Sequence, residues 1–409
     1  MKSRDAAIKI VERLRRKHHE ALLAGGCVRD MLLERPAKDF DVATDATPEQ
    51  VKQIFKRTLE VGAKFGVVIV FMDSHQIEVA TFRTESGYTD GRHPTQVEFA
   101  HAAEDAKRRD FTVNGMFYDP IEDKVIDYVD GRSDLDTRTI RTIGDPEERF
   151  GEDYLRMLRA VRFSTQLRFR IEPATWAAIK KHAEKITGIS AERIAMELEA
   201  TLVDPNRGAG AAMLIKSGLA ENIFPCFVGK EAKFAIKVLS ELRQKTDFPL
   251  VLAAFFAGFP TKFALEKCQS LRLSKNHYKH LKFLLGNRGK LLEAEMPIAE
   301  LKMLAAEPYF WGLYELQRAT QKASPAKAGG IAPLVALRRR IRGWGDEDLR
   351  PAPLLDGHDL MRLGAVPGPA LGQLAEEMYI AQLEGELKTP QEAKAWVRCW
   401  LQKHKDAEA

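Results

Sequence analysis

Residues 21–44 read ALLAGGCVRDMLLERPAKDFDVAT, and this stretch decides how the first part of the chain is expected to fold. Residues 21–24 are all apolar and form a short strand pattern that runs into a pair of glycines. Residues 27–33 then favour a helix, and residues 40–43 return to a strand pattern. The stretch therefore predicts a strand, a glycine turn, a helix and a second strand in close succession.

The glycine pair, Gly25 and Gly26, is a candidate phosphate site. Where a strand leads through glycines into a helix, backbone N–H groups at the helix N-terminus can hold a phosphate. Arg29, in the expected helix, adds a guanidinium that can bind two phosphate oxygens. The alternative is a tight turn in which glycine only permits a positive φ angle, and the glycines by themselves favour it.

Two aspartates at the second strand, Asp39 and Asp41, are the candidate metal ligands. Residues two apart on a strand point to the same face, so the two carboxylates are expected to lie side by side. Adjacent carboxylates repel each other unless a cation lies between them, and Mg²⁺ prefers oxygen ligands. The pair could therefore hold two Mg²⁺ ions for in-line displacement at a phosphoryl group. An acidic strand end facing solvent is the alternative, but the phosphate-type turn just upstream favours the metal site.

Three charged residues further along, Arg108, Arg109 and Asp110, form a second candidate site. The two arginines could bind a triphosphate while Asp110 accepts a hydrogen bond from a ribose hydroxyl. Upstream, residues 83–94 mix acidic, basic and aromatic side chains and are expected to form a mobile loop. A solvated run of charges is the alternative for the arginines, and the cluster alone does not decide.

A third cluster, EDYLRMLRAVR at residues 152–162, is typical of a helix. Asp153 and Arg156 would be neighbours on one helix face, where a carboxylate that accepts and a guanidinium that donates can mimic a base-pairing edge. Such a pair suits cytosine or adenine, whereas uracil and guanine offer the wrong polarity. Arg159 and Arg162 would extend the basic stripe towards phosphates. An ion pair on an exposed helix is the alternative, and the spacing alone favours it.

Composition limits the class of protein. The 409 residues suffice for about two to four domains, and 45% hydrophobic with 30% charged residues excludes collagen-like, mucin-like and largely disordered chains. The net charge of +5 only mildly suggests a polyanionic partner. The longest apolar stretch, residues 248–259, is too short to span a membrane. The four cysteines lie far apart without a C-x-x-C pair, which favours a reducing cytoplasm over zinc ribbons or disulfides.

The pattern changes along the chain. Strand patterns separated by turns occupy residues 21–24, 40–43, 65–71, 77–82 and 125–129. Residues 65–71 are nearly all apolar, as expected for a strand buried on both faces. Helical periodicity dominates from Pro146, which is a plausible helix start because two acidic residues follow it.

Taken in order, these motifs resemble the class II tRNA nucleotidyltransferases, which are the CCA-adding enzymes, and the related bacterial poly(A) polymerases. The resemblance rests on GGCVRD…KDFDVAT, IEVATFRTESGYTDGRHP, KRRDFTVNGMFYDP, IDYVDGRSDL and EDYLRMLRAVRF. It is dense over residues 20–205, and a weaker similarity lies at 358–387.

The resemblance implies an α+β protein in four parts. A nucleotidyltransferase head with a small β-sheet would occupy residues 1–145. An all-α neck for base recognition (146–205), a body (206–322), a linker (323–335) and a tRNA-binding tail (336–409) would follow.

The resemblance also implies roles for the candidate residues. Gly25, Gly26 and Arg29 would hold the triphosphate, Asp39 and Asp41 two Mg²⁺ ions, Arg108, Arg109 and Asp110 the triphosphate and ribose, and Asp153 and Arg156 the base, supported by Arg159 and Arg162. The loop with Asp90 and Arg92 matches the segment that the family uses to switch from CTP to ATP. Glu78 is a candidate third acid. Glu34 stands where the family usually has glycine, which puts the local backbone geometry in question.

The expected function is template-independent addition of CCA to the 3′ end of tRNA from CTP and ATP, with release of pyrophosphate. The expected partners are tRNA and the two nucleotides, in the cytoplasm, without a membrane or DNA. A poly(A) polymerase and a partial enzyme that adds only CC or only A are the alternatives, and residues 90–94 favour full CCA addition. An inactive RNA-binding protein is more remote, because both Asp39 and Asp41 are present.

Overall fold

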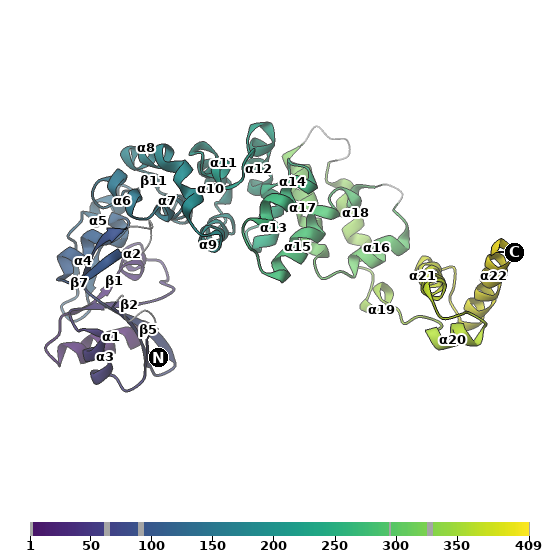
Figure 1. Cartoon of the computed structure of the whole chain (residues 1–409), viewed down its shortest axis with the longest axis horizontal. Coiled ribbons are helices and arrows are strands. Elements are labelled where there is room, and N and C mark those ends of the chain that lie inside the picture. The colour runs from purple at the N-terminus through teal and green to yellow at the C-terminus, as the bar shows by residue number, and fades with distance from the viewer. Residues whose placement is uncertain (1–2, 61–65, 89–93, 294–295, 325–329, 409) are drawn as a thin grey trace. The chain divides into compact units, whose positions relative to one another are not determined.

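The computed structural model describes residues 3–60, 66–88, 94–293, 296–324 and 330–408, and Figure 1 shows its elements in chain order. The contacts divide the chain into two compact units. Unit 1 comprises Met1–Ile236 with Lys267–Leu273, and unit 2 comprises Lys237–Glu266 with Ser274–Ala409.

Unit 1 is built on a mixed sheet, which has seven strands in the described part of the chain, in the order β3-β4-β5-β2-β1-β8-β9. The strands are β1 Ala21–Ala24, β2 Asp41–Thr44, β3 Thr58–Glu60, β4 Val67–Met72, β5 His75–Thr81, β8 Phe117–Asp119 and β9 Lys124–Ile126. Neighbours run antiparallel except β2 and β5, which are parallel. With the helices described below, this sheet confirms the predicted α+β fold.

Helix α1 (Ser3–Arg15) packs against β1, β2 and β5. Its apolar side chains recur at helical spacing, so one face, including Ile10 and Leu14, is fully buried. Helix α3 (Pro48–Ile54) contacts α1, β4 and β5, and a capping box at Thr47 fixes its start. These helices hold the central strands in place.

A compact apolar cluster fixes the strand ends that lead into the candidate site. It consists of Leu22, Ala24, Ala43, Phe82, Ala102, Ala106 and Phe117. Ala102 and Ala106 belong to α4 (Ala102–Arg108), so the cluster holds α4 against β1 and β2. Helices α2 (Gly26–Leu32) and α5 (Gly131–Asp136) and the short η2 (Thr112–Asn114) contact one another or β1 around it. The ends of β1, β2 and α4 therefore keep fixed relative positions.

Residues 83–88 form a strand rather than the mobile loop expected from the sequence. Strand β6 (Arg83–Tyr88) pairs antiparallel with β7 (Pro94–Phe99) as a separate hairpin. The backbone N–H of Arg83 donates to the buried Asp105 of α4, which ties the hairpin to the helix. The mixed polar sequence does not determine by itself whether this segment forms a strand, and pairing with β7 decides it. Asp90 and Arg92 lie outside the described residues.

The rest of unit 1 is helical. Its elements are α6 Pro146–Glu152, α7 Leu155–Leu167, α8 Pro173–His182, η3 Ala183–Gly188, α9 Ala191–Leu202, α10 Arg207–Lys216 and α11 Leu219–Ile223, with short strands β10 Thr139–Ile140 and β11 Arg170–Ile171. The predicted helix start at Pro146 is confirmed, and Asp145 caps it by accepting from the N–H of Glu147 at 2.8 Å. Helix α7 packs between α9 and α10.

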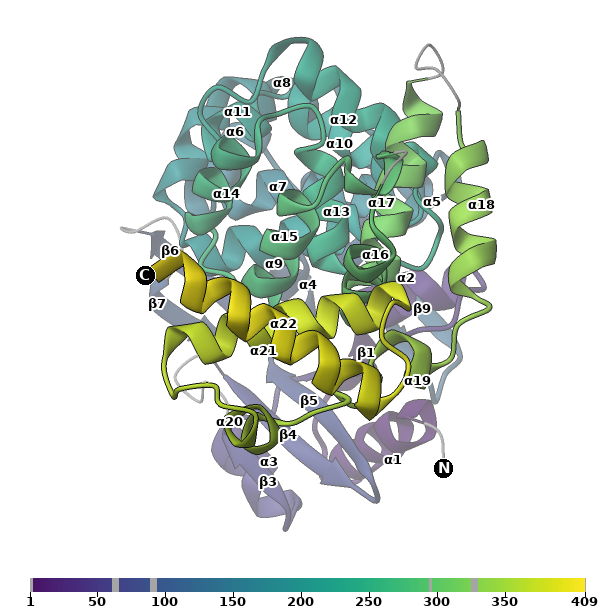
Figure 2. The ribbon, with the colours of Figure 1, turned by 90° about the vertical axis from the view of Figure 1, so that its right-hand side faces the viewer.

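In the described residues of unit 2, every regular element is a helix. Helices α12 (Gly229–Glu241) and α14 (Thr261–Gln269) each have residues in both units. The other helices are α13 Phe248–Phe255, α15 Lys275–Gly286, η4 Lys290–Leu292, α16 Ile298–Ala305, α17 Phe310–Ala323, α18 Ala332–Ile341, α19 Asp346–Leu349, α20 Gly357–Arg362, α21 Pro369–Glu384 and α22 Pro390–Glu408. Helices α21 and α22 lie side by side over a shared apolar core (Figure 2). Among the described helices, none has the length and apolar character needed to cross a membrane.

Two sequence expectations differ in detail from the fold. Strand β4 alternates, with Val68 and Val70 buried and Val67 and Ile69 half-buried, so the prediction of burial on both faces was wrong. The reason is position, because β4 lies next to the edge strand β3 and α1 and α3 contact it. Helix α18 begins at Ala332, inside the segment predicted as a linker. The division into four parts stays a prediction.

Candidate active site

Two adjoining cavities open where β1, β2 and β5 meet α7 and α9. The first cavity measures about 510 Å³ and the second about 740 Å³. The first is lined by all ten predicted nucleotide-binding residues, Gly25, Gly26, Arg29, Arg108, Arg109, Asp110, Asp153, Arg156, Arg159 and Arg162, and by Asp41, Glu78 and Arg193. Its lining thus has seven arginines against four carboxylates, so it attracts an anionic ligand.

Gly25 forms the turn that the sequence predicted, but it uses its N–H within the fold. Its backbone has φ 76° and ψ −131°, a conformation that side chains with a Cβ rarely adopt. A Cβ there would also approach Nη1 of Arg109 to 3.0 Å. The Gly25 N–H donates to the carbonyl of Met116 at 3.2 Å, whereas the phosphate site predicted at the N–H groups of α2, which begins at Gly26, stays a prediction. The glycine lets Arg109 approach the turn.

Asp39 and Asp41 do not share a strand face as expected. Strand β2 begins at Asp41, and Asp39 lies in the irregular segment before it. Asp41 is half-buried and lines both cavities, whereas Asp39 is exposed and lines only the second. Val42 pairs with Val79, and continuing that parallel register by one residue places Asp41 alongside Glu78. Asp41 is therefore one of three neighbouring carboxylates, with Glu78 on β5 and Asp39 in the segment before β2.

The surroundings of Asp41 disfavour its negative charge. Burial raises its pKa to about 6, Glu78 and Asp39 act in the same direction, and Arg109 opposes them. Within the described residues, no group of three or more His, Cys, Asp or Glu side chains is placed to hold a metal ion by itself. Mg²⁺, however, is commonly held by one or two carboxylates together with substrate phosphates. The carboxylates at Asp41 fit that second arrangement.

Arg108 and Arg109 are oriented by Asp105, a buried residue of α4. One Asp105 oxygen accepts from Nε of Arg108 at 2.8 Å, and the other from Nε and Nη2 of Arg109 at 3.1 and 3.0 Å. Burial by itself would raise the pKa of Asp105, but the two arginines outweigh it and the pKa is lowered. The two arginines are thus held at the cavity wall rather than solvated on a helix surface.

Asp110 is buried and already paired with Arg159. Its Oδ2 accepts from Nε and Nη2 of Arg159 at 2.7 and 2.5 Å, and its Oδ1 accepts from Nδ2 of Asn114 at 3.2 Å. Burial alone would raise the pKa of Asp110, but Arg159 and Asn114 hold it at about 2. Asn114 also accepts from Nη1 of Arg29 at 2.7 Å. It therefore links Arg29, the predicted phosphate ligand, to Asp110, the predicted ribose ligand.

Asp153 lies at a break between two helices and not on a helix face, so that expectation was wrong. Helix α6 ends at Glu152, and Asp153 has the extended angles φ −149° and ψ 103°. Its Oδ1 accepts from the N–H of Leu155 at 3.0 Å, and its Oδ2 from Nη2 of Arg193 at 2.7 Å. The carboxylate is therefore fixed in direction from both sides.

The three arginines of α7 each have an acidic partner. Arg156 donates from Nη1 to Glu152 at 2.5 Å, not to Asp153. Arg162 lies 2.9 Å from a carboxylate oxygen of Glu197, which also faces Arg159 at 3.8 Å. The three arginines form a basic stripe on α7 as predicted, but the carboxylates of Glu152, Asp110 and Glu197 partly neutralise its charge.

Sequence reasoning missed five residues of this site: Asp105, Asn114, Glu152, Arg193 and Glu197. Asp105 could have been found, because it precedes Arg108 and Arg109 by three and four residues on a helix. Arg193 and Glu197 come from α9, more than thirty residues along the chain, and nothing local marks them.

Known domain families match unit 1. A family described as "Poly A polymerase head domain" matches residues 21–141, and one described as "Probable RNA and SrmB- binding site of polymerase A" matches residues 168–229. The first match covers the sheet and the glycine turn, and the second begins at the C-terminal end of α7.

Characterised relatives match over nearly the whole chain. The CCA-adding enzyme of Lactobacillus gasseri is 35% identical over 397 residues, which cover 95% of each chain. That of Streptococcus agalactiae is 44% identical over 396 residues, which cover 95% of this chain and 94% of the relative. The crystal structure of the Bacillus stearothermophilus CCA-adding enzyme in complex with CTP is 29% identical, covers 100% of both chains and superposes with a TM-score of 0.79. By identity, coverage and fold, the chain belongs to the CCA-adding enzymes, which are tRNA nucleotidyltransferases.

Proposed function

We propose that this chain adds CMP, CMP and AMP in turn to the 3′ end of tRNA, using CTP and ATP and no nucleic-acid template. The single observation that carries the proposal is the first cavity, which brings arginines suited to a triphosphate and a pair suited to a base edge together with Asp41. Relatives named as CCA-adding enzymes support it. We place the activity in the cytoplasm, since the four cysteines are free thiols.

The triphosphate is proposed to lie against Arg29, Arg108 and Arg109. Arg29 is held by Asp30 and Asn114, and Arg108 and Arg109 are held by Asp105. Guanidinium groups fixed in advance bind phosphate oxygens without the entropy cost of ordering a long side chain. They also neutralise charge on the departing pyrophosphate.

Asp153 and Arg156 are proposed to read the base. Each oxygen of the Asp153 carboxylate takes one donor from the protein, which leaves lone pairs for the exocyclic amine of cytosine or adenine. Arg156 uses Nη1 for Glu152 and for the carbonyl of Arg149, and a guanidinium has further N–H groups for a ring nitrogen. Uracil and guanine present a carbonyl and an N–H at these positions, so they are rejected.

Asp39 and Asp41 are proposed to hold two Mg²⁺ ions together with the substrate phosphates, with Glu78 alongside Asp41. The donor set fits, because a divalent cation would offset the burial and the carboxylate repulsion that raise the pKa of Asp41. When bound, the ions would lower the pKa of the RNA 3′-hydroxyl and stabilise the leaving pyrophosphate. The part played by the chain is to place both substrates at Asp41.

The second cavity is proposed to receive the 3′ end of the tRNA. It shares Gly26, Arg29, Asp41, Arg162 and Phe163 with the first cavity, so an RNA end there would meet the nucleotide at Asp41. Its wall adds the basic residues Arg35, Lys38 and Arg168, which suit an RNA backbone.

The test uses tRNA transcripts that end at the discriminator base, at C or at CC. Each receives CTP, ATP or both with Mg²⁺, and products are resolved to single nucleotides. Two C additions and one A addition, then a stop, are expected. Long adenosine tails would indicate a poly(A) polymerase, and CC alone or A alone would indicate a partial enzyme.

Single variants separate catalysis from binding in the same assay. Asp39→Ala and Asp41→Ala should abolish incorporation while tRNA binding survives. Asp45→Ala is the matched control, because Asp45 follows β2 directly and lines neither cavity. No incorporation by the unaltered chain on any substrate would indicate an inactive RNA-binding protein.

A further inference from the structure

Arg149, on α6, joins the two halves of the first cavity without lining it. Its Nη2 donates to the backbone carbonyls of Arg108 and Arg109, at 2.5 and 2.8 Å. These carbonyls belong to the residues whose side chains are proposed to bind the triphosphate. Arg149 therefore holds the backbone of the triphosphate-binding segment from behind.

The same guanidinium also holds the base-reading side. Nη1 of Arg149 donates to Oε2 of Glu152, and this oxygen accepts from Nη1 of Arg156 at 2.5 Å. One carboxylate oxygen thus links Arg149 to Arg156. Nη1 of Arg156 also donates to the backbone carbonyl of Arg149 at 2.8 Å, a contact that a change of side chain at residue 149 would leave in place.

We propose that Arg149 is a positioning residue that couples base reading to triphosphate placement, so that a nucleotide is aligned for reaction only when both ends fit. This inference rests on the proposed function, because it takes Arg156 as a base reader and Arg108 and Arg109 as triphosphate ligands. Arg149 does not line either cavity, so it acts through these neighbours and is not a catalytic residue.

The geometry requires arginine. The side chain of Arg149 is 11% exposed, and its guanidinium serves two carbonyls and one carboxylate in different directions. A guanidinium presents five N–H donors in a rigid planar fork, whereas a lysine ammonium is a single point on a flexible stem. Lysine at residue 149 would therefore keep the charge and part of the contacts, but it would not hold the carbonyls of Arg108 and Arg109 and the carboxylate of Glu152 in fixed relative positions.

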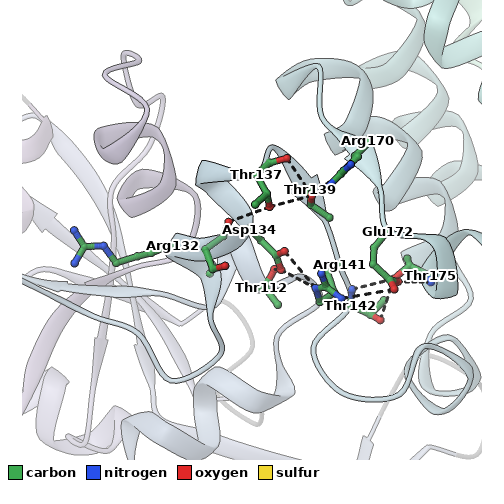
Figure 3. Close-up of polar contacts among 12 residues, drawn as sticks. Thr112, Arg132, Asp134, Thr137, Thr139, Arg141, Thr142, Arg170, Glu172 and Thr175 are labelled. Atoms are coloured by element: carbon green, nitrogen blue, oxygen red, sulfur yellow. Dashed lines mark hydrogen bonds and ion pairs between the residues drawn. The ribbon is translucent and has the colours of Figure 1, made fainter.

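A second arginine of unit 1 provides a matched control. Arg141 bridges Asp134, at 3.0 Å from Nε, and Glu172, at 3.6 Å from Nη1, as Figure 3 shows. It thus joins residues before and after Pro146 by ion pairs, whereas Arg149 does so by hydrogen bonds to two backbone carbonyls and an ion pair with Glu152. Arg141 lines neither cavity, and its two acidic partners are not shared with Arg149, which pairs with Glu152.

The experiment measures kcat/KM for CTP and for UTP in the full chain on a tRNA ending at C. The variants are Arg149→Met, Arg149→Lys, Arg141→Met and Arg156→Met, with thermal unfolding recorded for each. We expect Arg149→Met to lower the preference for CTP over UTP by about 10- to 100-fold, the range found when residues that orient the ligands of metal ions are removed. Arg149→Lys should recover part of the preference, and Arg141→Met should lose stability but keep the preference.

Inhibition by inorganic tripolyphosphate, which carries no base, provides the second readout. Arg149→Met and Arg149→Lys should both bind it more weakly, because the carbonyls of Arg108 and Arg109 lose their anchor. Arg156→Met should bind it as the unaltered chain does. Only coupling through Arg149 predicts a loss in both assays from one residue outside the cavities.

The outcomes separate this inference from the proposed function. If Arg156→Met loses base preference while Arg149→Lys keeps both base preference and tripolyphosphate binding, the coupling is wrong and the base reader stands. If Arg156→Met itself keeps base preference, the proposed base-reading role fails. Because Arg149→Lys retains the charge, it decides the question even if Arg149→Met does not fold.

Discussion

At the scale of one residue, Asp41 is an acidic side chain in surroundings that disfavour its negative charge, and its ionised form therefore lowers the stability of the fold. Its burial, Glu78 and Asp39 all raise its pKa, to about 6. A folded-state pKa above the ordinary value means that the ionised form is disfavoured in the fold. The residue is therefore placed for binding a cation and not for stability.

Asp41→Asn should make the chain more stable in EDTA and inactive in nucleotide addition. Neutralising the side chain removes the penalty, which is about 3 kcal/mol for a pKa raised from 3.8 to about 6. The free energy of unfolding from urea titrations at pH 7 measures it, and the advantage should shrink when Mg²⁺ is added. Asp45→Asn is the control. Equal stability of Asp41→Asn and the unaltered chain in EDTA would contradict the electrostatic account.

Glu34 has a left-handed backbone conformation of the kind that glycine adopts without strain. Its φ is 53°, so the left-handed turn is kept although Glu has a Cβ. The turn that the sequence put in question is thus formed with a strained backbone at Glu34.

Glu34→Gly should raise the free energy of unfolding by about 0.5 kcal/mol. Relief of left-handed strain is worth roughly 1–2 kcal/mol, and the greater freedom of glycine in the unfolded chain offsets part of it. Denaturant titration measures the change. Glu34→Ala keeps a Cβ and should gain nothing, and an equal gain from it would exclude backbone strain as the cause.

At the scale of elements, the break between α6 and α7 decides how a base is read. A continuous helix would have placed Asp153 and Arg156 as an ordinary ion pair. Because of the break, Asp153 pairs with Arg193 of α9 and Arg156 pairs with Glu152. Asp153 and Arg156 therefore do not neutralise each other. Both remain able to bond a base.

Asp153→Ala should reduce discrimination of CTP and ATP against UTP and GTP by at least about tenfold, since a hydrogen bond to a charged group is worth roughly 1.5–3 kcal/mol. Single-turnover incorporation of each nucleotide measures it. Asp145→Ala is the control, because Asp145 caps α6 and lines neither cavity. This variant should be less stable but equally selective. Unchanged selectivity in Asp153→Ala would contradict base reading by this residue.

At the scale of the whole molecule, both cavities are lined by residues of unit 1. Ligands stabilise the unit that binds them, by about 2.7 kcal/mol at a concentration one hundred times Kd. CTP should therefore slow hydrogen exchange in peptides covering α2, α4 and α7 and leave α15 and α21 unchanged. UTP is the control and should protect less. Equal protection of both units would contradict a site confined to unit 1.

Unit 2 should carry its own pH dependence through His280. Burial lowers its pKa, His277 acts in the same direction, and Asp247, 3.7 Å away, opposes them. Because the unfolded chain binds this proton more readily, stability should fall as pH drops below about 6.5, the ordinary histidine value. His280→Gln should flatten the dependence of unfolding on pH between 5 and 7.5. His358→Gln, at an exposed position on α20, should not.

The sequence by itself determined the family, the α+β class and the ten nucleotide-binding candidates, all of which line one cavity. It could do so because glycine turns, paired acids and helical arginines are local patterns of residue type and spacing. The start of α6 at Pro146 was predictable for the same reason, since Asp145 and the acids after it form a local cap.

Only the tertiary structure decided which partner each charged group takes. Arg162 meets Glu197 through packing of α7 against α9, and Arg159 meets Asp110, which lies 49 residues earlier, so no local spacing specifies those pairs. The hairpin of β6 and β7, the break at Asp153 and the position of Asp41 beside Glu78 likewise depend on strand pairing and helix packing. Contacts between segments far apart in the chain are set by burial and complementary charge, which only the assembled fold defines.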